Sequence, residues 1–85
     1  MNLNHLQYFL ETCRYGSITK ASEVCHISQP SITAAINNLE KELGAKLFDR
    51  VNNRLRLTVV GEGFKDLTEE FLKTFDDYCQ SAYDI

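Results

Sequence analysis

Apolar residues recur at helical spacing in the middle of the chain and predict its central helix. Four of them follow one another at steps of four, three and four residues, which places them on one side of a helix: Ile32, Ile36, Leu39 and Leu43. Ser28 is a suitable N-cap, and Pro30 falls in the first turn, where its missing N–H costs nothing. Gly44 can then adopt the left-handed conformation that ends a helix. The pattern predicts a helix over 29–43.

A first amphipathic stretch lies near the start of the chain. Asn2 or Asn4 can cap a helix that runs to about Tyr15, and Gly16 ends it. Its apolar face comprises Leu3, Leu6, Phe9, Leu10 and Cys13. The stretch therefore predicts one helix that packs against the rest of the domain.

A second, shorter helix is predicted over about 18–25, capped by Ser17. Its inward residues are Ile18, Ala21 and Cys25, and the small Ala21 lets another helix cross closely. Only three residues, 26–28, connect it to the central helix. Two helices joined so tightly are typical of a helix-turn-helix unit, in which the second member reads a DNA groove.

The period changes after the central helix. Two short runs, 47–51 and 54–58, bracket Asn52 and Asn53, and the second run alternates apolar residues with arginines, as a strand does. An Asn pair tolerates the positive φ of a two-residue hairpin turn. The predicted hairpin, or wing, carries three grouped arginines that suit phosphates or a minor groove: Arg50, Arg54 and Arg56. The alternative is a solvated edge ribbon whose charges block aggregation.

The last helix is predicted to begin after Thr58, which can cap it, with Glu62 in its early turns. Gly61 and Gly63 lower helix propensity near its start and therefore suggest a close approach to another element. An apolar stripe continues far along the helix, at Val60, Phe64, Leu67, Phe71, Phe75, Tyr78 and Ala82.

This stripe is longer than a small body can cover, because more than 20 helical residues span about 30 Å. It is most economically buried against a second copy of the same helix, leaving acidic residues in water at Glu69, Glu70, Asp76 and Asp77. The alternative is a helix folded wholly onto its own domain.

The outward side of the central helix is small and hydrogen-bonding, with one full charge. It comprises Pro30, Thr33, Ala34, Asn37 and Lys41. Such a face can lie deep in a major groove, where bulky side chains would hold the helix away from the bases. The alternative is a surface helix that is rich in small polar residues.

Length and charge fit one small domain that contacts DNA through part of its surface. The 85 residues are 44% hydrophobic, as in a folded chain, and carry a net charge of −3. Residues 1–58 hold seven Lys and Arg against five Asp and Glu, whereas residues 59–85 hold two against seven. A mildly basic body with an acidic tail predicts DNA contact through the body and weak binding by a lone monomer.

Other function classes find little support in the sequence. The three cysteines at 13, 25 and 79 lack metal-type spacing and are interpreted as reduced core residues, with a redox switch or a metal site as the alternative. His5 and His26 are isolated, and they are interpreted as a surface residue and a turn residue. With no catalytic constellation and no glycine-rich phosphate loop, neither an enzyme nor a bound cofactor is expected.

No apolar run could span a bilayer and no signal peptide is visible, so a cytoplasmic protein is expected.

The motifs together resemble the N-terminal DNA-binding domain of the LysR-type bacterial transcriptional regulators. The match runs from Leu3 to about Tyr78, and its most specific part is Ser-Gln-Pro-Ser at 28–31. The other matching residues are Leu6, Phe9, Gly16, Ser17, Ala21, Leu39, Glu40, Leu43, Gly44, the run at 47–50, Leu57, Thr58, Gly61 and Glu62.

The resemblance implies a mainly α fold, a winged helix-turn-helix of three helices and a two-stranded β wing over 1–58. A long linker or dimerisation helix over 59–85 would follow it. The expected function is sequence-specific binding of double-stranded DNA with a dyad-symmetric site, as a homodimer formed through the linker helix. The family usually continues into a larger C-terminal domain that senses a small-molecule effector, and this domain is expected to be missing here.

Carried over from the family, the base-facing positions are Gln29, Pro30, Ser31, Thr33, Ala34 and Asn37. Backbone contacts would come from Thr19, Lys20, Ser28, Arg50, Arg54 and Arg56. The dimerisation residues would be Phe64, Leu67, Phe71, Phe75 and Tyr78. Ala34 and Ala35 stand where many members carry a long polar side chain, which lowers the expected number of base contacts. The rival reading is a dimerisation or protein-docking module without DNA binding, which would have no need of a basic wing.

Overall fold

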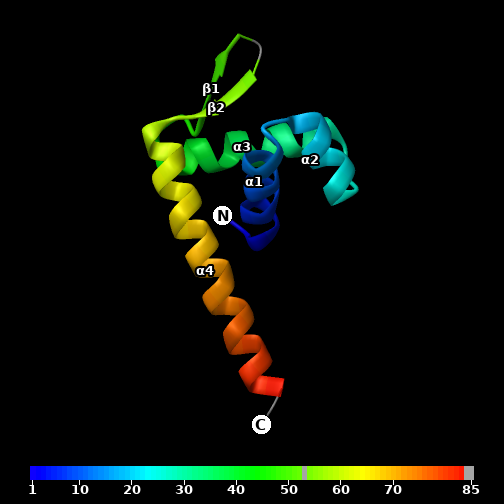
Figure 1. Ribbon diagram of the computed structural model, residues 1–85, viewed down its shortest axis with the longest axis vertical. Coiled ribbons are helices and arrows are strands. Elements are labelled where there is room, and N and C mark those ends of the chain that lie inside the picture. Colours follow the sequence, from blue (N-terminus) through cyan, green and yellow to red (C-terminus); the bar gives the residue numbers. More distant parts are fainter. Residues whose placement is uncertain (53, 84–85) are drawn as a thin grey trace.

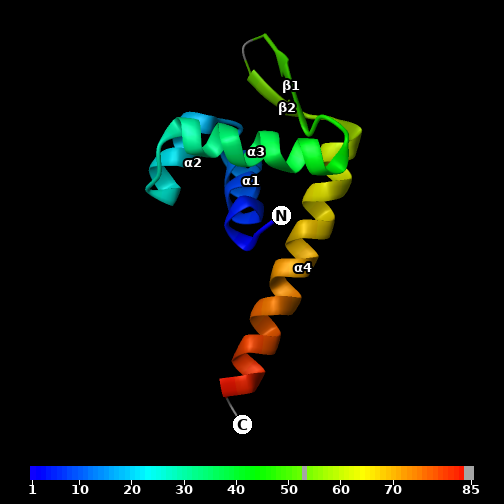
Figure 2. The ribbon, with the colours of Figure 1, turned by 180° about the vertical axis from the view of Figure 1, so that it is seen from behind.

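Four helices and one hairpin make up the chain in a computed structural model (Figure 1), which describes residues 1–52 and 54–83. The elements follow in the order α1 (Leu3–Tyr15), α2 (Ile18–Cys25), α3 (Gln29–Leu43), β1 (Phe48–Val51), β2 (Arg54–Leu57) and α4 (Val59–Tyr83). Figure 2 shows α3 lying across the end of α1, with α2 at one end of α3 and the wing and the start of α4 at the other. This is the predicted mainly α winged helix-turn-helix.

Side-chain caps and left-handed residues set the helix ends. Asn2, Ser17 and Ser28 each accept a hydrogen bond from the backbone amide three residues later, which confirms the three predicted N-caps. Gly16 and Gly44 adopt φ of 60° and 71° and end α1 and α3. His26, which was predicted to be a turn residue, ends α2 with a left-handed φ of 58°.

The core forms where α1, α3, α4 and the wing meet. Leu6, Phe9, Leu39 and Leu47 are buried together, and Phe64 of α4 packs on Phe9 with ring centroids 5.2 Å apart. A second buried group holds α2 against α3, and it comprises Ala21, Ile32 and Ile36. Phe48 contacts both groups, so the start of the wing is anchored in the same core as the helices.

Several burial assignments made from the periodicity were wrong. Leu43 in the last turn of α3 is 38% exposed, whereas Ala35 is buried beside Ile36. Leu3 is exposed at the start of α1. Two threonines, Thr12 and Thr68, are fully enclosed, and neither was singled out, since the periodicity counted only apolar residues.

The wing is the predicted antiparallel hairpin. Phe48 pairs with Leu57 at its base, and Val51 pairs with Arg54 at its tip. Asn52 has the left-handed φ of 52° that the turn prediction required, whereas Asn53 lies outside the described residues.

The first turns of α4 lie directly on the wing and the core. The Thr58 hydroxyl accepts from the Gly61 amide at 2.9 Å, which confirms the predicted cap. A Cβ on Gly61 would overlap the backbone carbonyl of Leu47, so the predicted close approach is real there. A Cβ on Gly63 would meet nothing within 4 Å, and the same prediction was wrong for that residue.

The three cysteines differ in how they pack against the core. All three cysteines are free and half-buried, and Cys13 and Cys25 pack against the core. Cys79 belongs to neither buried group, so its assignment to the core was wrong. Burial raises the pKa of the Cys13 thiol to about 12, which leaves it protonated and unreactive near neutral pH.

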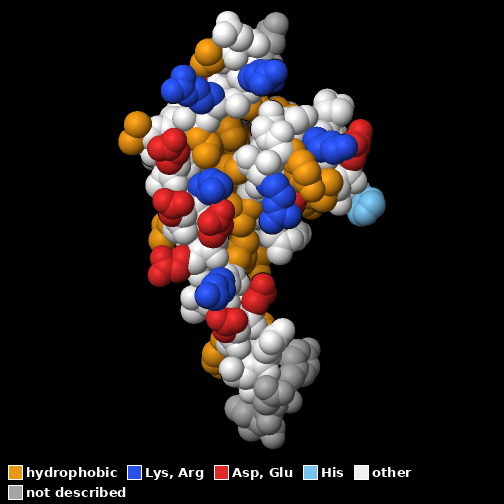
Figure 3. All heavy atoms as spheres, viewed as in Figure 1, with side chains coloured by type: hydrophobic (Ala, Val, Ile, Leu, Met, Phe, Trp, Pro, Cys, Tyr) orange, Lys and Arg blue, Asp and Glu red, His pale blue; other side chains and the backbone are white. Residues whose placement is uncertain are grey.

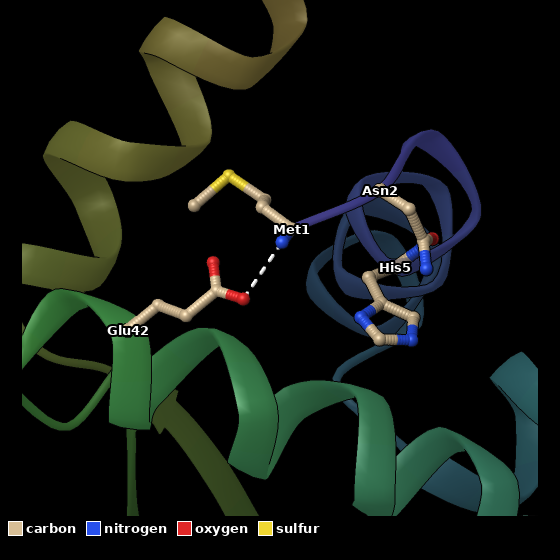
Figure 4. Close-up of polar contacts among 4 residues, drawn as sticks. All are labelled: Met1, Asn2, His5 and Glu42. Carbon is tan, nitrogen blue, oxygen red and sulfur yellow. Dashed lines mark hydrogen bonds and ion pairs between the residues drawn. The ribbon is translucent and has the colours of Figure 1, made fainter.

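The start of the chain is fastened to the end of α3. The Met1 ammonium lies 2.7 Å from the Glu42 carboxylate (Figure 4). His5 points toward α3 in the same view and is half-buried rather than on the surface.

None of the helices in the described part of the chain is both long and apolar enough to cross a membrane.

Candidate nucleic-acid interface

One side of α3 is open to solvent along its whole length. The six positions carried over as base-facing are all exposed: Gln29, Pro30, Ser31, Thr33, Ala34 and Asn37. The opposite side is buried through Ile32, Ile36 and Leu39, which hold the helix on the core. The helix therefore presents short, mostly uncharged side chains outward on a rigid support.

The start of α3 is ordered by two serines. Ser28 Oγ accepts from the Ser31 amide at 3.2 Å, and the two hydroxyls lie 2.9 Å apart. Ser28 is thus engaged in capping, and its remaining hydrogen-bonding capacity is shared with Ser31. Gln29 and Pro30, which lie between the two serines, are exposed to solvent.

A groove runs between α3 and the wing. One part is lined from α3 by Thr33 and Asn37 and from the wing by Arg50 and Leu55. It continues past Gln29 to residues 16–19, at the junction of α1 and α2. The backbone-contact candidate Thr19 lies in this second part, whereas Lys20 faces solvent and lies 3.9 Å from Glu23. The groove brings together side chains from three segments that are distant in the sequence.

The three wing arginines do not share one face. Opposite residues of an antiparallel pair lie on the same side of the ribbon, and the sides alternate along each strand. Arg50 is opposite Leu55, on the side that faces α3. Arg54 and Arg56 are opposite Val51 and Asp49, on the other side. The wing therefore carries all three predicted arginines, each of them exposed, but divides them between its two faces.

Sequence reasoning missed two kinds of residue at this surface. Ile18 and Leu55 supply apolar walls of the groove, and the alternation of leucine with arginine in β2 was the signal for Leu55. Glu40 was noted only as part of the resemblance. Its carboxylate accepts from the Leu47 amide at 2.7 Å, just before the wing.

A second candidate surface follows α4. Four of the five proposed dimerisation residues are exposed, with exposed fractions up to 73% for Tyr78: Leu67, Phe71, Phe75 and Tyr78. The fifth, Phe64, is half-buried against Phe9, and its outer edge lines an apolar hollow together with Leu67 and Phe71. Figure 3 shows hydrophobic side chains along α4 and basic ones on the wing.

Metal chemistry has no visible support: among residues 1–52 and 54–83, no group of three His, Cys, Asp or Glu side chains is placed to hold an ion.

A helix-turn-helix with an adjoining hairpin and an exposed helix beside a partly basic groove defines the class of winged-helix domains found in nucleic-acid-binding proteins. Residues 3–62 match the family model for bacterial regulatory helix-turn-helix proteins of the lysR family. The chain belongs to this family. Its members are transcription regulators, not enzymes.

Individual relatives agree with this assignment. The transcriptional activator protein LysR of Escherichia coli is 41% identical over 85 residues, which is 100% of this chain. The uncharacterized regulator YcgK of Bacillus subtilis is 39% identical over 77 residues, or 91% of this chain. The chain spans 24% of the length of either protein.

Among solved structures, a complex of BenM_DBD with catB site 1 DNA is similar to this chain, with a TM-score of 0.95 and 33% identity. The match covers 100% of this chain and 94% of that one.

Proposed function

We propose that this chain is the sequence-specific DNA-binding domain of a LysR-type transcriptional regulator. The supporting observation is the groove between α3 and the wing. Its walls hold an amide, a hydroxyl and a guanidinium group that are free to face one ligand: Gln29, Thr33 and Arg50. Family membership and the DNA in the similar BenM_DBD complex support the same conclusion.

In the proposed complex, α3 enters a major groove of double-stranded DNA. Gln29 is the first choice for a base contact, because its amide can pair with adenine at N6 and N7. Pro30 and Ala34 can pack on thymine methyl groups, and Ser31, Thr33 and Asn37 can bond to bases or phosphates.

Contacts with DNA phosphates are proposed for residues that surround α3. Arg50 would contact the DNA backbone from the side of the wing that faces α3. Arg54 and Arg56 would contact the DNA backbone or the minor groove from the other side of the wing. Thr19 and Lys20 at the start of α2, together with the hydroxyl of Ser28, complete the proposed backbone contacts.

The proposed active form is a homodimer joined through α4. Two copies would place their α3 helices in successive major grooves, so the target site is expected to be dyad-symmetric. In this proposal residues 1–58 form the DNA-binding unit and 59–85 the linker. A small-molecule effector would act through a further domain of the kind found in longer family members, and the regulator would work in the cytoplasm, where bacterial DNA lies.

Fluorescence anisotropy with a labelled random duplex tests the proposal. We expect binding that weakens as salt rises, because the arginines displace counterions from phosphates. Selection from a randomised duplex library is then expected to recover a dyad-symmetric sequence. A chain that binds no duplex at low salt would favour the protein-docking module instead.

A further inference from the structure

The wing joins the helices through three residues, Lys46, Leu47 and Thr58, which we call the wing base. Lys46 and Leu47 directly precede β1, whereas Thr58 follows β2 and immediately precedes α4. The Thr58 amide donates to the Leu47 carbonyl at 3.0 Å and closes the hairpin one residue pair below Phe48 and Leu57. The wing, α4 and the end of α3 therefore meet at these three residues.

A carboxylate of α3 holds one side of the wing base. Glu40 Oε2 accepts from the Leu47 amide at 2.7 Å, and Glu40 Oε1 lies 3.7 Å from Lys46 Nζ. The Glu40 side chain is only 11% exposed, so water competes little for its oxygens. A bond from an amide to an ionised acceptor is short and strong, and it fixes the direction in which the backbone leaves α3.

A hydroxyl at the start of α4 holds the other side. Thr58 Oγ1 donates to the Lys46 carbonyl at 2.6 Å and accepts from the Gly61 amide at 2.9 Å. One side chain thus caps α4 and fastens it to the wing base. The absence of a Cβ on Gly61 lets the first turn of α4 lie against the Leu47 carbonyl.

Apolar contacts alone would not fix the orientation of the wing relative to α3. Leu47 and Phe48 pack in the core and anchor the wing, but such contacts are non-directional. Beyond Phe48, every residue of β1 is exposed, and the support from β2 is again apolar, through the half-buried Leu55 and Leu57. Directional contacts come from the hydrogen bond that Glu40 accepts and from those that the Thr58 hydroxyl donates and accepts.

We propose that Glu40 and Thr58 are positioning residues for DNA binding, which hold the wing at the angle where it and α3 reach the same duplex. The inference rests on the proposed function, and it assigns neither residue a contact with DNA. Both act through the wing base on the arginines of the hairpin.

Salt titrations with random duplex test the proposal through two pairs of variants. Glu40→Ala and Thr58→Val remove the hydrogen-bonding atoms, whereas Glu40→Gln and Thr58→Ser keep an oxygen that can replace them. We expect the first two variants to lose about 0.9 of the salt slope, d log K/d log[salt], for each wing arginine that leaves a phosphate. The second two are expected to keep the wild-type slope.

Asn2→Ala is the matched control, because it removes the cap of α1 and none of the hydrogen bonds of the wing base. We expect this variant to melt at a lower temperature and to retain the wild-type slope. Wild-type slopes for folded Glu40→Ala and Thr58→Val would overturn the positioning role and leave the proposed function intact. A wild-type chain without salt-dependent binding would overturn the proposed function itself.

Amide hydrogen exchange of the wild-type chain supplies a readout that needs neither DNA nor a folded variant. The Leu47 amide is expected to exchange slowly, because Glu40 is its acceptor. Exchange at the rate of an unstructured amide would show that the Glu40 contact is absent in solution and would overturn the inference.

Discussion

Neighbouring side chains of α3 have opposite surroundings. Ala34 is exposed on the outward side, whereas Ala35 is 2% exposed and packed in the body. A long polar side chain could extend from position 34 toward a ligand, but at position 35 it would have to displace the core. The expectation that the small side chain of Ala35 lowers the number of base contacts was therefore wrong, because that position belongs to the packing of the body, whereas it stays a prediction for Ala34.

Replacing Gln29 by alanine tests direct base reading. Gln29→Ala is expected to cost roughly 1–3 kcal/mol of binding free energy on the selected site and to relax the preference at one base pair. Repeating the library selection measures both effects. Gln7→Ala, an exposed glutamine on α1, is the control and should change neither. An unaltered base preference in Gln29→Ala would remove this residue from base reading.

Replacing Arg54 tests the outer side of the wing. Because a phosphate contact is independent of sequence, Arg54→Ala should weaken binding to all duplexes alike and lower the salt slope by about 0.9. Arg14→Ala, an exposed arginine on α1 that lies 3.3 Å from Glu11, is the control and should leave the slope unchanged. Equal slopes for both variants would mean that the outer side of the wing is away from DNA.

At the scale of elements, helix ends were the most predictable feature, because Asn2, Ser17 and Ser28 act through local hydrogen bonds that sequence alone reveals. It was less predictable which wing arginines lie on the side that faces α3. The two-residue turn fixes the strand register and so separates Arg50 from Arg54, but which side of the ribbon meets α3 depends on contacts between residues distant in the sequence.

Alanine substitutions at Gly61 and Gly63 of α4 separate the effect of close packing from that of helix propensity. Gly61→Ala places a methyl group against the Leu47 backbone and is expected to destabilise the fold by about 1–3 kcal/mol. Gly63→Ala enters open space within a helix and is expected to stabilise it by roughly 0.5–1 kcal/mol. Urea unfolding monitored by circular dichroism measures both changes. A loss of stability in both variants would contradict the difference in packing.

At the scale of the whole molecule, α4 extends away from the body, and the molecule measures 50 × 26 × 19 Å (Figure 1). The helix touches the core through Phe64 and Leu72. Exposed large apolar side chains on it are Val59, Val60, Leu67, Phe71, Phe75 and Tyr78. The Phe71 and Phe75 rings stack with centroids 6.5 Å apart, so these exposed apolar side chains are contiguous rather than scattered, which supports the proposed role of α4 in pairing two copies.

A charge on this surface tests pairing. Phe71→Asp is expected to shift the chain from dimer to monomer in sedimentation equilibrium, because an unpaired carboxylate would be buried between two copies. Gln80→Asp adds the same charge on the other side of α4 by helical spacing and should leave the dimer intact. Equal association of both variants and the wild type would place the interface elsewhere.

The overhang of α4 also has a consequence for the helix itself. Within the described part of α4, no residue past Leu72 belongs to the core groups, and an isolated helical segment of about ten residues is marginal in water. Dilution should therefore unwind these last turns as pairs of chains separate. Helix content would then vary with protein concentration, and far-ultraviolet ellipticity would serve as a gauge of self-association.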